Sequence, residues 1–118
     1  MLAIANGKAF ACSSNDAKVF VLSQSGEVLQ THGKRGSGPA GVLNGPDLTL
    51  AVDSEESMLV VDHGNDRLQV CDASGQWSVF DLEPRISRPT CAAVIDNKLY
   101  VCSGSPYDTY SLSVYDSE

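Results

Sequence analysis

The amino-acid sequence predicts an all-β protein, a β-propeller fragment of about three four-stranded antiparallel blades, the third incomplete. Two observations predict this class. Short apolar strands alternate with turn residues, and no stretch keeps the 3.6-residue apolar period of a helix. The pattern then repeats at an offset of 49 residues, which aligns Val21 with Val70 and Gly26 with Gly75. Four antiparallel strands that recur every 40–50 residues are typical of propeller blades.

The first copy covers about residues 2–32 of a single partial propeller that spans residues 1–118. We name the strands of each blade a to d from the centre of the ring outward. Runs rich in Val, Leu, Ile and Phe predict strands over 2–5, 8–12, 18–22 and 25–29. Asn6-Gly7 is typical of a two-residue hairpin turn, and Ser25-Gly26 predicts the turn between strands c and d.

The second copy covers about residues 48–82 and the third about residues 91–116. The second repeats the a to d pattern over 50–53, 58–62, 67–72 and 74–79. The third begins with apolar runs on either side of an Asp96-Asn97 hairpin turn and ends at 112–116. We therefore expect the third blade to lack its outer strand.

The second copy resembles an NHL repeat. Residues 61–70 are similar to its hallmark, a strand followed by a D-x-G-N-x-R turn, and residues 33–39 and 72–75 resemble its flanking turns. The resemblance is specific over 33–82, whereas 13–18 departs from the motif and the long loop 103–110 is reminiscent of kelch-type blades. It implies kinship with the C-terminal propellers of tripartite-motif NHL proteins, whose rings commonly have six blades and bind protein partners or RNA.

The hallmark residues Asp62, His63, Asn65 and Arg67 are interpreted first as parts of the b–c loop. We expect Asn65 to take a left-handed turn conformation, with Gly64 adding backbone freedom. We expect Arg67 to pair with Asp62 or with backbone carbonyls between blades. The alternative is that these side chains form a binding site.

Catalysis has no support in the sequence, so we predict no enzyme, no catalytic residue, no metal and no cofactor. There is no nucleophile elbow, phosphate-binding loop or H-E-x-x-H motif. Enzymes that place metal ligands around the central channel need His or acidic residues where strand a begins, and Leu2, Leu50 and Ala92 lie there. A propeller lyase or hydrolase stays the third alternative.

The cysteines predict a reducing compartment. A hairpin turn at Asp96-Asn97 places Cys91 opposite Cys102 at a hydrogen-bonded pair, where a disulfide is geometrically awkward. We therefore favour four reduced, mostly buried thiols. No signal peptide and no bilayer-spanning run is present, so we expect a cytoplasmic protein without a membrane partner.

Charge distribution gives candidates for binding. The net charge is −7, but six of the eight basic residues fall on the face formed by the d–a and b–c loops, while acidic residues gather on the opposite face. Clustered cations with aromatic platforms are what RNA binding needs. Protein binding through this loop face is favoured and RNA is the alternative, because a nearly neutral face releases few counterions. The candidate residues for either ligand are Lys34, Arg35, His63, Arg67, Arg85, Arg88, Tyr107 and Tyr110.

Fewer than three complete blades cannot close a ring, which needs about four. We favour a piece of a longer product, and we expect self-association, because the open flanks and the strand-c edge at 112–115 are apolar. Two copies give six blades, so a homodimer that closes a six-bladed ring is the favoured assembly.

Overall fold

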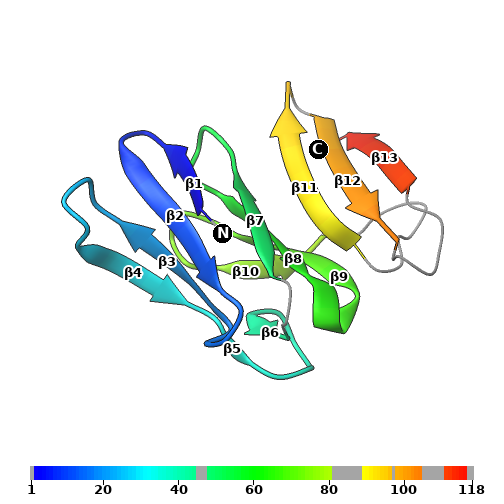
Figure 1. Cartoon of the computed structure of the whole chain (residues 1–118), viewed down its shortest axis with the longest axis horizontal. Helices are drawn as coiled ribbons and strands as arrows, with labels where there is room; N and C mark the ends of the chain where they lie inside the picture. The colour runs from blue at the N-terminus through cyan, green and yellow to red at the C-terminus, as the bar shows by residue number, and fades with distance from the viewer. Residues whose placement is uncertain (1, 45–47, 81–88, 97, 105–110, 117–118) are drawn as a thin grey trace.

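Three antiparallel sheets lie side by side in the computed structural model, each as one blade (Figure 1). The structure describes residues 2–44, 48–80, 89–96, 98–104 and 111–116. The innermost strands of the three sheets are neighbours, with β7 in contact with both β1 and β11. This arrangement of repeated four-stranded antiparallel sheets confirms the predicted all-β propeller architecture.

Blade 1 is a four-stranded sheet in the order β1-β2-β3-β4. Its β1–β2 turn has positive φ at both central positions, 52° at Asn6 and 73° at Gly7, as a type I′ hairpin turn requires. The strands are β1 (Leu2–Ala5), β2 (Lys8–Ser13), β3 (Lys18–Leu22) and β4 (Val28–His32).

Blade 2 repeats the same order outward from β7, and its b–c connection forms a short 3₁₀ turn, η1 (His63–Asn65). The strands are β7 (Thr49–Val52), β8 (Met58–Asp62), β9 (Arg67–Cys71) and β10 (Trp77–Val79). The connection from blade 1 carries a feature that the sequence did not predict, a parallel pair of β5 (Lys34–Arg35) and β6 (Val42–Leu43).

Blade 3 has three strands in the described ranges, β11 (Pro89–Ile95), β12 (Lys98–Ser103) and β13 (Ser111–Asp116). They pair in chain order, and no other strand within those ranges pairs with the outer edge of β13. No helix in the described part of the chain is long and apolar enough to cross a membrane.

Two apolar clusters hold the blades together. The first fills the junction of blades 1 and 2 and includes Phe10, Val19 and Met58. The second fills the junction of blades 2 and 3 and includes Leu59 and Leu99. Blade 2 therefore buries both of its faces, because alternate residues of each strand point to opposite sides of a sheet.

Candidate functional site

The b–c loop of blade 2 is organised around a buried carboxylate. Asp62 is 0% exposed and lies at the end of β8. Its Oδ1 accepts a hydrogen bond from Asn44 N at 2.8 Å. Its Oδ2 accepts from Asn65 Nδ2 at 2.9 Å, Arg67 Nε at 2.9 Å and Gln69 Nε2 at 3.0 Å. A buried charge is stabilised when it is paired and fully hydrogen-bonded in this way.

The same side chains fix the d–a loop that precedes blade 2. Arg67 donates from Nη1 to Gly38 O at 2.7 Å and from Nη2 to Val42 O at 2.7 Å. Gln69, also 0% exposed, donates to Val42 O and accepts from Gly41 N, both at 2.9 Å. Residues 38–44 are therefore held to blade 2 by side chains from β8 and β9, and Asn65 of η1 donates to Gly36 O at 3.0 Å. We call this arrangement the Asp62 network.

Two of the predicted binding residues serve this internal bonding. Arg67 makes the predicted pair with Asp62, and only 17% of its side chain is exposed. The Nδ1 atom of His63 lies 2.9 Å from Pro89 O, which connects the loop to β11. The turn differs in one detail from the expectation, because Asp66, and not Asn65, is left-handed with φ 59°. Asn65 instead belongs to the 3₁₀ turn, where its amide reaches Asp62.

The exposed candidates are on the d–a loop. Lys34 and Arg35 form β5 and are both exposed, and the Nη2 atom of Arg35 donates to Asn15 O. The exposed surface continues over residues 37–40. Of the other predicted residues, Arg85, Arg88, Tyr107 and Tyr110 lie outside the described residues.

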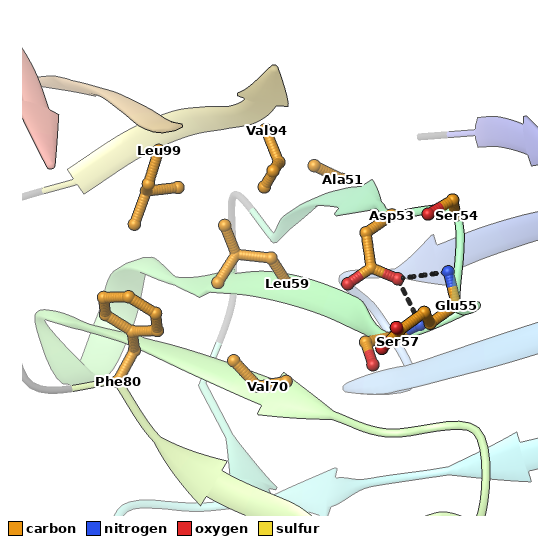
Figure 2. A pocket seen from close by; sticks show the side chains of 10 residues that line it. All are labelled: Ala51, Asp53, Ser54, Glu55, Ser57, Leu59, Val70, Phe80, Val94 and Leu99. Carbon is orange, nitrogen blue, oxygen red and sulfur yellow. Dashed lines mark hydrogen bonds between the residues drawn. The ribbon is translucent and has the colours of Figure 1, made fainter. Parts of the chain in front are cut away.

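The structure also contains a cavity that the sequence did not reveal. It has a volume of about 330 Å³ and lies between blades 2 and 3. Figure 2 shows Val94 and Leu99 of blade 3 across from Leu59 and Val70 of blade 2, with Phe80 at one end. The β7–β8 turn borders the other end, where the Asp53 carboxylate accepts from Glu55 N and Ser57 N, both at 2.9 Å (Figure 2).

The cavity exists because the junction of blades 2 and 3 has smaller side chains than the junction of blades 1 and 2. The 49-residue offset and the strand registers align Lys8 with Ser57 and Phe10 with Leu59. The first junction keeps a smaller cavity of about 130 Å³, beside which Lys8 Nζ reaches across to Glu56 Oε1 at 2.8 Å. Ser57 is too short to do the same. The smaller side chains at these aligned positions are the signal in the sequence that the second junction is less filled.

The cavity offers an apolar interior and a carboxylate rim, with Asp53 and Glu55 at its edge. No group of three His, Cys, Asp or Glu side chains within the described residues is arranged to hold a metal ion. The chemistry that this arrangement allows is binding of an apolar group, with Asp53 and Glu55 nearby for a cation.

Cys91 and Cys102 are opposite each other in the β11–β12 register, as the hairpin turn predicts, and both are thiols in the structure. A hydrogen bond with the Cys91 thiol raises the pKa of Cys102. Burial raises the pKa of Cys71 to about 11, and the neighbouring Asp72 carboxylate adds to the rise. Raised pKa values leave these thiols weakly nucleophilic, because the thiolate is the reactive form.

Comparison with known proteins supports the fold and indicates no function. No family model and no curated protein matches the chain. Among the solved structures that match is one described as "Streptogramin B lyase structure", with a TM-score of 0.63 and 16% sequence identity. The match covers 94% of this chain and 38% of that chain, so this chain spans well under half the length of that propeller. At this identity the likeness shows the β-propeller fold alone.

Proposed function

We propose that this chain is part of an NHL-type β-propeller scaffold that binds a protein partner through its d–a and b–c loops and catalyses no reaction. The observation that carries the proposal is the Asp62 network, which fixes residues 36–44 from inside the protein. Lys34, Arg35 and residues 37–40 are thereby presented on an ordered loop. An ordered loop loses less conformational entropy on binding than a loose one.

Charge favours a protein over RNA as the partner. Affinity for nucleic acid depends on phosphate contacts by Lys and Arg, and the chain carries a net charge of −7. Protein recognition requires only a few buried anchors and no net charge. The four cysteines are all thiols in the structure, which is compatible with the cytoplasm, where we place this interaction.

A charge-reversal pair tests the proposal. The variant K34E/R35E changes the exposed d–a loop, and E27K is the matched control, because Glu27 is exposed in the c–d turn on the opposite face. Immobilised wild type, K34E/R35E and E27K are incubated with cytosolic extract, and the captured proteins are quantified by mass spectrometry. Far-ultraviolet circular dichroism verifies that each variant is folded.

The expected result is a set of proteins that wild type and E27K capture and that K34E/R35E loses at least tenfold. Fluorescence anisotropy with labelled poly(U) RNA tests the alternative. RNA binding that disappears in K34E/R35E, without any such protein set, would replace the protein-binding function with RNA binding. Identical capture by all three proteins would refute a role for this loop face.

A further inference from the structure

We propose that the cavity between blades 2 and 3 binds an organic ammonium ion with an apolar body, of the size of an arylalkylamine. The cavity is internal, because its walls are the facing sides of two neighbouring blades. It is also separate from the loop face, since the β7–β8 turn that borders it lies at the other end of the strands from the d–a and b–c loops. The inference is therefore independent of the proposed protein-binding function.

The interior of the cavity is apolar. Leu59 and Leu99, from the second strands of the two blades, are 6% and 1% exposed and line opposite walls. Val70 and Val94 extend these walls, and the Phe80 ring lies at one end (Figure 2). A dry apolar cavity of about 150 Å³ accommodates a benzene molecule. The volume here is about 330 Å³, which is enough for a phenyl ring with a short chain attached.

The opposite end of the cavity is acidic. The Oδ1 atom of Asp53 accepts hydrogen bonds from Glu55 N and Ser57 N, both at 2.9 Å, and these bonds fix the carboxylate on the β7–β8 turn. Figure 2 shows its other oxygen directed toward Leu59 and the interior. Glu55 adds a second carboxylate, and none of the described side chains that line the cavity is a Lys, Arg or His. An apolar space with a fixed carboxylate at one end complements a cation that is joined to an apolar group.

The junction of blades 1 and 2 indicates which groups such a ligand carries. Lys8 and Phe10 line the smaller cavity of that junction, and Lys8 Nζ lies 2.8 Å from Glu56 Oε1. The chain thus supplies an ammonium group and an aromatic ring of its own. The aligned residues of the second junction are Ser57 and Leu59, which supply neither. A ligand with an ammonium group and an aromatic ring replaces what these two positions lack.

The walls of the site come from the inner strands of blade 3. In the first junction the outer strand of the following blade, β10, is described, and none of its residues lines the cavity. In the second junction the lining residues of blade 3 are Val94 of β11 and Leu99 of β12. The corresponding space is therefore bounded by the first two strands of the following blade and does not require its outer strand.

A pair of isosteric ligands tests the proposal on the full chain. The cation 2-phenylethylammonium and the neutral 2-phenylethanol have the same shape and differ in charge. Each is titrated into nitrogen-15-labelled protein, and the amide chemical shifts give both the Kd and the location of binding. Ligands of this size are expected to bind with a Kd of about 1 mM or below. The ammonium ion should bind at least about threefold more tightly than the alcohol, as one partly exposed ion pair allows, with the largest shifts at residues 53–57 and at Leu59 and Leu99.

Two variants separate the charge from the volume of the cavity. D53N/E55Q removes both negative charges and keeps an oxygen acceptor for the β7–β8 turn. The matched control is D72N, because the Asp72 carboxylate accepts two backbone hydrogen bonds in the same way in the β9–β10 turn and does not line this cavity. S57K/L59F gives the second junction the residues of the first and fills the space. Circular dichroism verifies that each variant is folded.

The two ligands are expected to bind D53N/E55Q with equal affinity, whereas D72N keeps the wild-type preference for the ammonium ion. S57K/L59F should bind the ammonium ion at least tenfold more weakly than wild type. Equal affinities of the two ligands for wild type, shifts centred on the d–a loop, or no saturable binding up to about 20 mM would overturn the proposal. An undiminished preference for the ammonium ion in D53N/E55Q would overturn it as well, whether or not S57K/L59F folds.

Discussion

Replacing Asp62 with alanine is expected to remove the organising group of the b–c loop. Asn65 and Gln69 keep other acceptors, Gly36 O and Val42 O. Asn44 N and Arg67 Nε lose the Asp62 carboxylate oxygens that accept their hydrogen bonds. Each buried donor left unpaired costs about 1–3 kcal/mol, and breaking a buried ion pair on one side costs about 3–5 kcal/mol. The two estimates agree on a loss of about 3–5 kcal/mol.

Urea unfolding followed by circular dichroism measures this loss. With a denaturant slope of about 2 kcal/mol per molar, the midpoint falls by roughly 2 M. A loss of this size is a large fraction of the stability of a typical domain, about 5–15 kcal/mol. The matched control is D72A, which removes an exposed carboxylate that accepts hydrogen bonds from Ser74 N, Ser74 Oγ and Gln76 N.

D72A is expected to shift the midpoint much less, because water replaces the lost partners at an exposed turn. In the folded D62A protein, trypsin should cleave after Lys34 and Arg35 faster than in wild type, since the d–a loop is no longer held. Equal midpoints for D62A and D72A, or unchanged cleavage, would refute the assignment of Asp62 as the group that fixes this loop.

Three further predictions concern single sites. Gly33→Ala should lower the urea midpoint more than Gly26→Ala. Both glycines have positive φ, at a strain cost of about 1–2 kcal/mol for other residues, but a Cβ at Gly33 also meets Leu43 Cδ1 at 3.0 Å, whereas Gly26 faces open space. Cys71 should react with a thiol reagent at pH 8 only as the protein unfolds. Because its pKa is raised from 9.0 to about 11, the linked stability is lost as the pH rises from 9 toward 11, a loss that C71A should reduce. Lys8→Met should destabilise the protein above pH 4.5 and progressively less below it. The reason is that the hydrogen bond from Lys8 lowers the pKa of Glu56 from 4.5, so the stability that it adds is lost as the carboxylate is protonated. A stability difference between the two proteins that does not change with pH in urea titrations would contradict this.

The strands were predictable because each blade repeats a short apolar pattern whose period of two matches the pleat of a sheet. The 49-residue offset even gives the correct register, since Phe10 and Leu59 occupy the same position in their blades. The β5–β6 pair was not predictable in this way. It has two residues in each strand within a Gly- and Ser-rich segment, and its position depends on distant donors such as Arg67.

The candidate site was predictable in its chemistry and less so in its geometry. The D-x-G-N-x-R spacing indicated that Asp62 and Arg67 pair, whereas the buried role of Gln69 was missed. A polar residue in the middle of a strand gives no sign of burial by itself, and the matching residue of blade 1 is Phe20. The cavity was missed because its volume depends on side chains from two different blades, which only three-dimensional packing brings together.

The Asp62 network also changes how the charge of the loop face should be counted. From the sequence, Arg67 is one of six basic residues on that face. In the folded chain its Nε lies 2.9 Å from Asp62 Oδ2, and two backbone carbonyls accept from its Nη atoms at 2.7 Å. A cation neutralised in this way is not available to a phosphate, so fewer counterions are released on binding than the sequence count suggests. Among the described residues, this leaves the exposed pair Lys34 and Arg35 as the principal cations of the d–a loop, which favours a protein partner over RNA.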